Sequence, residues 1–222
     1  LMPIGRQIAE SLVVHGKTQG RDPRKAAIAM LEEVGIPEPE IRYNQYPFEL
    51  SGGMCQRAMI AMALICRPKL LIADEPTTAL DVTIQAQILD LMKRLRDEMG
   101  TAILLITHDM GVVADMADRV AVMYAGRVIE QAAVETIFAR QEHPYTKLLL
   151  STIPRLDGSP KTMLPSIEGV VPDIGHWPVG CRFNPRCPMA QQICIEKDPP
   201  LIPRSDIGVA ACWFSKEVEA RL

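Results

Sequence analysis

The chain has 222 residues, of which 48% are hydrophobic and 23% are charged, and its formal net charge at pH 7 is −3. This length supports one good hydrophobic core and a small appendage. Because the net charge is slightly negative, the chain lacks the overall positive charge that is typical of nucleic-acid-binding domains, so we expect no nucleic-acid partner. The longest apolar run, Ala58 to Cys66, has nine residues and is far too short to cross a bilayer.

The first fifty residues have the pattern of an interrupted helical region. Apolar side chains recur at helical spacing near the start of the chain. Asp22 and Pro23 form a cap and first-turn pair, and Gly35 ends the helix that follows them. We therefore expect a helical subdomain over residues 1–50.

A strand–helix–strand pattern follows the helical region. The predicted elements are a helix over 51–66, a strand over 69–73, a helix over 83–99, a strand over 102–106 and a hairpin over 120–129 that turns at Ala125-Gly126. The first of these helices is apolar on nearly all sides, so we expect it to be buried. The two strands are unbroken apolar runs, as in a parallel sheet covered on both faces. Together, strand, helix and strand predict a βαβ unit.

Two adjacent carboxylates follow the first predicted strand. Asp74 and Glu75 lie at the sheet edge where open α/β sheets bind ligands. Asp74 is suited to hold Mg²⁺ through water, because Mg²⁺ keeps much of its hydration shell. Glu75 can orient or deprotonate an attacking water. An Asp-Glu pair alone would be interpreted as two surface acids. The Ser-Gly-Gly string upstream and the Thr-His pair downstream favour a pair of functional carboxylates.

The string Leu50-Ser51-Gly52-Gly53-Met54-Cys55-Gln56-Arg57 opens the helix that precedes this strand. Ser51 can cap the helix and also meet a phosphate oxygen, and helix-start N–H groups bind anions. Gly52 and Gly53 allow close approach of the backbone. A Ser-Gly-Gly turn alone would be structural, and Gln56 alone a solvated helix residue. The full string is much more specific.

His108 lies just past the second predicted strand, at the same sheet edge as Asp74. An imidazole there can contact a γ-phosphate. A lone histidine after a strand is usually structural, but the carboxylates of the neighbouring strand favour a functional role. No G-x-x-x-x-G-K-[ST] phosphate loop occurs in these 222 residues.

Residues 49–57, 69–81 and 106–109 resemble the signature motif, the Walker B motif with its D-loop Ala79-Leu80-Asp81, and the switch histidine of ABC transporter nucleotide-binding subunits. Val122-Met123-Tyr124-Ala125-Gly126-Arg127 and His143-Pro144-Tyr145-Thr146 narrow the resemblance to the oligopeptide/dipeptide importer branch, which includes nickel importers. The resemblance covers essentially the whole chain. It implies an α/β fold with an ABC-type ATPase core, a parallel sheet and a helical subdomain.

The resemblance also implies an activity, with ATP and Mg²⁺ as cofactors. The chain would belong to an ATP-hydrolysing subunit that powers peptide import from the cytoplasmic face of the cell membrane, as a peripheral protein. Catalysis would rest on Glu75 and His108. Contacts to nucleotide or its metal would come from Ser51, Gly52, Gly53, Gln56, Asp74 and Asp81. The partners would be a second ATPase subunit, identical or different, two transmembrane permease subunits and, indirectly, an external peptide-binding protein.

The family's Walker A lysine and Q-loop glutamine would lie upstream of Leu1. We therefore expect the chain to be the C-terminal part of a longer protein, inactive by itself. Its domains would be a helical subdomain over 1–50, an ATPase core over 51–130 and a C-terminal region over 131–222. Two other classes compete: a soluble ABC ATPase acting on DNA or ribosomes, which would need a basic arm or coiled-coil insertion, and a non-catalytic metal-binding module.

From about residue 154 the chain is rich in proline, which predicts a separate, loop-rich module. Four cysteines in it, Cys181, Cys187, Cys194 and Cys212, have the spacing C-x5-C-x6-C-x17-C. Zinc ribbons usually show C-x2-C pairs, and disulfides suit secreted domains. Four thiolates also suit a [4Fe–4S] cluster, which the resemblance implies for this segment. We rank the cluster first, zinc second and free buried thiols third, and expect four neighbouring sulfurs.

Overall fold

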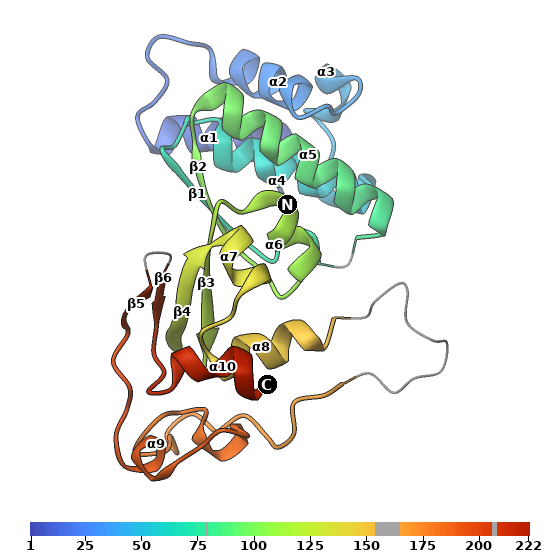
Figure 1. Ribbon diagram of the computed structural model, residues 1–222. Coiled ribbons are helices and arrows are strands. Elements are labelled where there is room, and N and C mark those ends of the chain that lie inside the picture. The colour runs from blue at the N-terminus through green and yellow to red at the C-terminus, as the bar shows by residue number, and fades with distance from the viewer. Residues whose placement is uncertain (79, 154–164, 206–207) are drawn as a thin grey trace. The chain divides into compact units, whose positions relative to one another are not determined.

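The computed structural model describes residues 1–78, 80–153, 165–205 and 208–222 (Figure 1). The chain divides into two compact units, Leu1–His108 and Asp109–Leu222. The first unit contains the predicted signature, Walker B and switch motifs, except that Ala79 of the D-loop lies outside the described residues. The second unit contains the four cysteines of the C-terminal segment.

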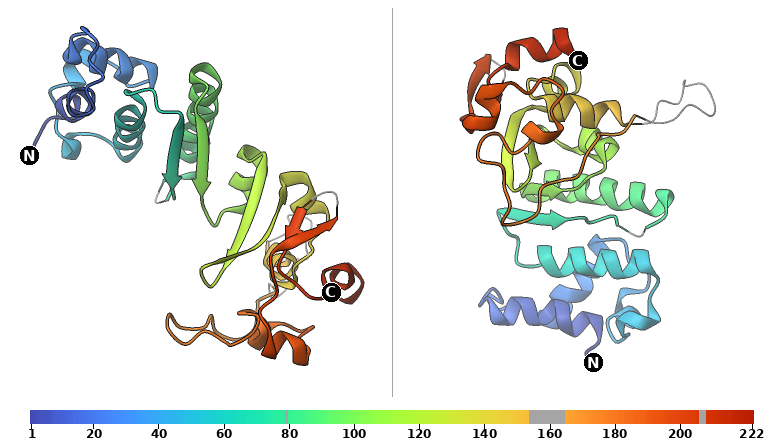
Figure 2. Two further views of the ribbon diagram at one scale, coloured as in Figure 1. Left: turned by 90° about the vertical axis from the view of Figure 1, so that its left-hand side faces the viewer. Right: turned by 90° about the horizontal axis from the view of Figure 1, so that it is seen from below.

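The first unit combines a group of helices with a two-stranded parallel sheet. Its elements, in chain order, are α1 (Ile4–Val14), α2 (Pro23–Glu33), α3 (Pro39–Arg42), the 3-10 helix η1 (Pro47–Glu49), α4 (Gly52–Leu64), β1 (Leu70–Asp74), α5 (Val82–Met99) and β2 (Ala102–Ile106). The helices α1, α2 and α4 contact one another, and Figure 2 shows these blue and cyan helices grouped near the N-terminus.

Local sequence signals explain the helical part of this unit. Asp22 caps α2, since its carboxylate accepts a hydrogen bond from the Arg24 N–H at 2.9 Å. Gly35 follows α2 with φ +75°, the left-handed conformation that glycine adopts without strain. The apolar faces of α1 and α2 bury Leu12 and Leu31 completely. The predicted helical pattern of residues 1–50 is confirmed.

The predicted βαβ unit is confirmed. Strands β1 and β2 pair in parallel, and the last pair in the register joins Asp74 to Ile106. The helix α5 connects them and buries Ile88, Met92 and Leu95. Because both strands end in register, the residues that follow them start from the same edge of the sheet.

The expectation that both faces of this sheet are covered is wrong for the described residues. Leu70, Ile72, Leu104 and Ile106 are between 46% and 61% exposed. The physical reason is that the described sheet has only two strands, with α5 as the crossover between them, so one face lacks a covering layer. The helix α4 is also less enclosed than expected, since Met59 is 60% exposed.

The second unit is built around a four-stranded antiparallel sheet in the order β3-β4-β6-β5. Its described elements are α6 (Met110–Met116), β3 (Arg119–Tyr124), β4 (Arg127–Ala133), α7 (Val134–Ala139), α8 (Pro144–Ser151), η2 (Asn184–Arg186), α9 (Gln192–Glu196), β5 (Ile202–Ser205), β6 (Gly208–Ala210), η3 (Ser215–Glu217) and α10 (Val218–Arg221). The predicted hairpin is confirmed: β3 and β4 turn at Ala125 and Gly126, with φ +47° and +77°, as two-residue hairpin turns require.

The described residues after 165 share a core with this hairpin. Phe183 is fully buried and packs edge-on against Tyr124 and Tyr145, with ring centroids 5.1 and 5.4 Å apart. Strand β6 pairs with β4, matching Glu130 to Ala210. The structure thus differs from the predicted separate module, because these residues complete the sheet and core of the second unit. The predicted module start at Pro154 lies outside the described residues.

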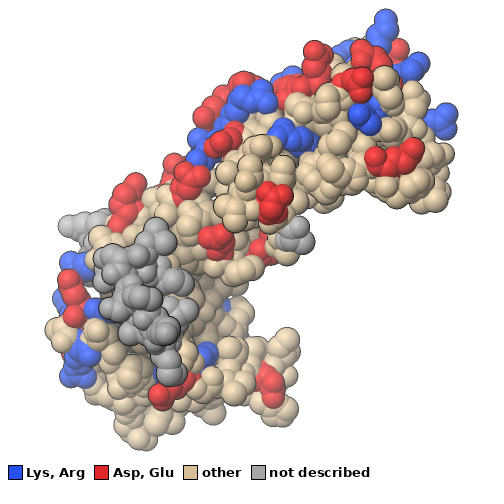
Figure 3. All heavy atoms as spheres, turned by 90° about the vertical axis from the view of Figure 1, so that its right-hand side faces the viewer, with Lys and Arg blue, Asp and Glu red and all other residues tan. Residues whose placement is uncertain are grey.

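Charged side chains of both signs are intermixed on the face drawn in Figure 3. Some charged side chains of the first unit form short-range pairs along a helix, such as Arg94 and Glu98 of α5, whose charged atoms are 3.7 Å apart. Exposed pairs of this kind contribute little to stability. Within the described ranges of the chain, no helix is long and apolar enough to span a membrane.

We expect Leu31→Ala to destabilise the first unit by about 2–5 kcal/mol, because it leaves a cavity on the buried face of α2. Leu31 is 0% exposed, whereas Val14 is 71% exposed, so Val14→Ala is the matched control and should change stability little. Urea denaturation followed by circular dichroism measures both. Equal shifts in the two unfolding midpoints would show that α2 does not anchor this core.

Candidate functional site

The C-terminal end of β1 carries a strained backbone turn. Glu75 has φ +47°, a left-handed conformation that costs a non-glycine residue about 1–3 kcal/mol and clusters at functional sites. Its N–H donates to the Ile106 carbonyl at 2.9 Å, and its own carbonyl accepts from the Thr78 N–H at 3.2 Å. Pairing with β2 and a closed turn therefore hold Glu75 in this conformation.

Both oxygens of the Glu75 carboxylate have a side-chain partner. His108 Nδ1 lies 2.7 Å from Oε1, and the Thr78 hydroxyl donates to Oε2 at 3.0 Å. The hydrogen bond from His108 lowers the pKa of Glu75 below its ordinary value. The structure thus places an oriented, ionised carboxylate beside an imidazole that is 84% exposed.

Asp74, Glu75 and His108 all lie at this one edge of the sheet, as the sequence predicted from strand order. Thr78 is a contact that the sequence analysis missed. The available signal was its position three residues after Glu75 in a tight turn, where a hydroxyl can reach back to the carboxylate. Asp81 caps α5, since its carboxylate accepts from the Ile84 N–H at 2.9 Å.

The signature string forms the start of α4. Ser51 is the predicted cap, and its hydroxyl accepts from the Met54 N–H at 3.4 Å. A Cβ atom added at Gly53 would lie 3.0 Å from Ile84 Cγ2, so this glycine lets α4 approach α5 closely. Ser51 and Gly52 are exposed, which leaves the N-terminal end of α4 accessible.

Two polar side chains of α4 tie it to neighbouring segments. Gln56 Nε2 donates to the Pro76 carbonyl at 2.5 Å, so its amide lies on the turn that follows Glu75. Arg57 Nη1 donates to the Val34 carbonyl at 2.7 Å, at the end of α2. The sequence predicted Gln56 as a nucleotide contact, whereas its structural contact is within the chain.

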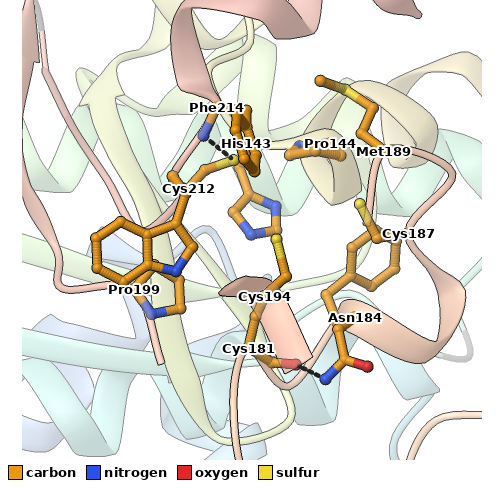
Figure 4. Close-up of a pocket in the computed structure, with 12 residues that line it drawn as sticks. His143, Pro144, Cys181, Asn184, Cys187, Met189, Cys194, Pro199, Cys212 and Phe214 are labelled. Carbon is orange, nitrogen blue, oxygen red and sulfur yellow. Dashed lines mark hydrogen bonds between the residues drawn. The ribbon is translucent and has the colours of Figure 1, made fainter. Parts of the chain in front are cut away.

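A second candidate site is a small cavity in the second unit (Figure 4). It has a volume of about 20 Å³, and its lining includes Cys181, Cys187, Cys194, Cys212 and His143. Burial raises the pKa of Cys187 to about 11 and of Cys212 to about 12. The six cysteines of the chain, all within the described ranges, form no disulfide bond.

The four thiols converge on one cavity but do not have the arrangement of metal ligands. Among the residues that the structure describes, no three His, Cys, Asp or Glu side chains are grouped so that they could hold a metal ion. The cavity has room for about one water-sized group. The expectation of four sulfurs already gathered around one centre is therefore not met, because the cavity between them is far too small for a cluster and their side chains do not group as ligands of one ion. A single ion or a cluster would require the side chains to move.

His143 is a buried neighbour of these thiols; the sequence analysis named it only as part of the motif His143-Pro144-Tyr145-Thr146 and gave it no site role. Burial lowers the pKa of His143 to about 3. Its Nδ1 accepts from the Tyr145 N–H at 3.0 Å, which caps α8. The Glu130 carboxylate accepts from the Glu142 and His143 N–H groups at 2.6 and 3.0 Å and fixes this segment. The available signal was a histidine before proline at a helix start.

Comparison with known proteins gives matches in both units. Residues 5–78 match the family model "ABC transporter", and residues 129–194 match "Oligopeptide/dipeptide transporter, C-terminal region". The chain also resembles the solved dimeric structure of an ATP-binding cassette in a post-hydrolysis state bound to ADP and Pi. That likeness has a TM-score of 0.51 and 30% identity over 60% of this chain and 57% of that chain.

Three curated relatives match nearly the whole chain. A Sinorhizobium fredii protein named as a probable peptide ABC transporter ATP-binding protein is 55% identical over 97% of this chain and 64% of its own length. The oligopeptide transport ATP-binding protein OppD of Bacillus subtilis is 52% identical over 96% and 60%, respectively. The dipeptide transport ATP-binding protein DppD of the same organism is 49% identical over 97% and 64%. The chain thus spans less than two thirds of these relatives.

The β1–α5–β2 unit, the helices before it and these matches define an α/β fold of the ABC ATPase class. Within that class, the chain resembles the ATP-binding subunits of oligopeptide and dipeptide ABC transporters.

We predict that His108→Ala raises the pKa of Glu75 toward its ordinary value, because the hydrogen bond from His108 is the largest cause of its lowering. Thr78→Ala should raise the pKa less, since the Thr78 hydrogen bond is a smaller cause. Carboxyl-carbon NMR titration of the labelled protein measures both shifts. A pKa of Glu75 that is unchanged in His108→Ala would contradict the contact.

Proposed function

We propose that the chain is the C-terminal part of an ATP-hydrolysing subunit that powers peptide import by an ABC transporter. The observation that carries this proposal is the Glu75 carboxylate, held between His108 and Thr78 directly after a strand end. The identities of about 50% to peptide-transport ATP-binding proteins support the same conclusion. A phosphate loop would come from a segment outside these 222 residues.

In the proposed reaction each side chain has a distinct task. Asp74, exposed at the end of β1, would hold Mg²⁺, which supplies charge neutralisation of the phosphates when bound. Glu75 would accept a hydrogen bond from the attacking water and orient it. His108 and Thr78 would keep that carboxylate in place, and the exposed His108 ring could also meet the γ-phosphate.

The start of α4 would serve a different nucleotide. Ser51, Gly52 and Gly53 present a helix N-terminus that suits phosphate oxygens, and in this class two subunits would meet with each nucleotide between them. A second ATPase subunit, identical or different, would therefore complete the site. Asp81, the cap of α5, would lie near that interface.

The remaining partners follow from the same proposal. Two transmembrane permease subunits would hold the ATPase at the cytoplasmic face of the membrane, and an external binding protein would deliver the peptide. Copurification of the full-length subunit with membrane permeases tests this arrangement against a soluble ABC ATPase. A full-length protein that binds no ATP would instead indicate a non-catalytic module.

We predict that Glu75→Gln in the full-length subunit leaves ATP binding intact and lowers turnover roughly 10²–10⁴-fold, the usual loss of a general base. Steady-state phosphate release and binding of a fluorescent ATP analogue give the two quantities. Asp90→Asn, an exposed acid on α5, is the matched control and should keep wild-type turnover. Near-normal hydrolysis by Glu75→Gln would remove Glu75 from the catalytic role.

We further propose that Cys181, Cys187, Cys194 and Cys212 hold a metal centre with a structural role, [4Fe–4S] first and zinc second. The support is that all four thiols of the stretch from Cys181 to Cys212 line one cavity. Such a centre would hold the loops around η2 and α9, which carry three of these cysteines, close to Cys212 at the end of β6. No step of hydrolysis is assigned to it.

We predict that anaerobically purified full-length protein contains iron and sulfide, and that Cys194→Ser lowers both. Metal analysis and the visible absorption spectrum measure the loading. Cys66→Ser is the matched control, because Cys66 lies outside this cavity. Finding zinc without iron would support a metal site but exclude the cluster. Finding neither iron nor zinc would contradict the proposal.

A further inference from the structure

The hydrogen bond from Gln56 to Pro76 joins two functional segments of the first unit. Gln56 lies in the second turn of α4, the helix whose N-terminal end carries Ser51 and the two glycines. Pro76 is the residue after Glu75, and it is buried. The 2.5 Å contact between Gln56 Nε2 and the Pro76 carbonyl therefore links two half-sites. One is the start of α4, proposed to meet the nucleotide of the partner subunit, and the other is the turn with Glu75, proposed to act on the nucleotide of its own subunit.

The turn that this contact holds is one that needs support. Glu75 is in the left-handed region at φ +47°, and such conformations persist only where the surrounding structure over-determines them. The Ile106 carbonyl holds the N–H of Glu75 on one side. Gln56 holds the carbonyl of the following residue on the other side, so the peptide segment around Glu75 is fixed at both ends.

The packing at the start of α4 makes this link stiff. The ideal Cβ of Gly53 would lie 3.0 Å from Ile84 Cγ2, so α4 and α5 touch where α5 begins. Arg57, the residue after Gln56, donates to the Val34 carbonyl at 2.7 Å and fastens the same stretch of α4 to the end of α2. A shift of the α4 N-terminus would therefore be transmitted through Gln56 to the turn.

We propose that Gln56 is a positioning residue that locks the turn after Glu75 onto the signature helix and so couples the two half-sites within one chain. This inference rests on the proposed function. Contact of Ser51 to Gly53 with the nucleotide of the partner subunit would steady α4, and Gln56 would then hold Glu75 in place for the nucleotide of its own subunit. Gln56 acts through Glu75 and does not itself touch the reacting atoms.

The test uses the full-length subunit in its assembled transporter with three substitutions. Gln56→Glu keeps the shape of the side chain but cannot donate to the Pro76 carbonyl. Gln56→Met is neutral, of similar length and also lacks a donor. Gln87→Glu is the matched control: it adds the same charge on an exposed part of α5, and its side-chain oxygen still accepts from Arg57, 3.4 Å away.

The first measurement is deuterium exchange of the peptide over residues 74–84. Both Gln56 variants should exchange faster there than the unsubstituted protein, and Gln87→Glu should not. A non-hydrolysable ATP analogue should protect residues 50–56 and 74–84 in the unsubstituted transporter. In the Gln56 variants the analogue should protect residues 50–56 only. Unchanged exchange over residues 74–84 would overturn the proposal.

The second measurement is a double-mutant cycle on turnover. Gln56→Met should lower kcat about 10–100-fold, the scale of a misplaced catalytic group, with ATP affinity unchanged. In the Glu75→Gln background it should change the residual rate less than about twofold. Equal losses in both backgrounds would indicate a merely structural role and overturn the proposal. Absence of Glu75-dependent hydrolysis in the unsubstituted transporter would contradict the proposed function, a separate outcome.

Discussion

The parallel pairing of β1 with β2 is the constraint on which the candidate ATPase site depends. The register ends with Asp74 beside Ile106, and the Ile106 carbonyl then accepts the N–H of Glu75. Because of this pairing, a carboxylate and an imidazole 33 positions apart in the chain come within 2.7 Å of each other. Without the crossover through α5, the same residues would be unrelated surface side chains.

The helix α4 is the second determinant of the site, and its residues have more than one task. Gly53 allows close contact with α5, while Ser51 caps the helix and leaves its N-terminal end accessible. The Gln56 side chain donates a hydrogen bond to the Pro76 carbonyl in the turn after β1, and the Arg57 side chain donates one to the Val34 carbonyl at the end of α2. The signature string at the start of α4, which is suited to binding phosphate, thus also connects α2 and α5 to the turn that follows β1.

The second unit shows how a proline-rich segment obtains a core. Phe183 inserts among Tyr124 and Tyr145, and β6 extends the sheet of the hairpin. The burial of one aromatic side chain therefore positions two cysteines near it in sequence, Cys181 and Cys187. The buried carboxylate of Glu130 accepts a hydrogen bond from the backbone N–H of His143 and so holds this residue in the lining of the same cavity.

The sequence by itself determined the elements and motifs. Apolar periodicity predicted the βαβ unit and the hairpin at Ala125-Gly126, and the order of the strand ends predicted that Asp74 and His108 share an edge. These features depend on local spacing, which the sequence contains directly. Only the tertiary structure decided the contacts of Thr78 and Gln56, the shared core around Phe183 and the exposed face of β1 and β2. Each of these depends on which distant surfaces meet, and burial and hydrogen bonding between distant segments leave no local pattern.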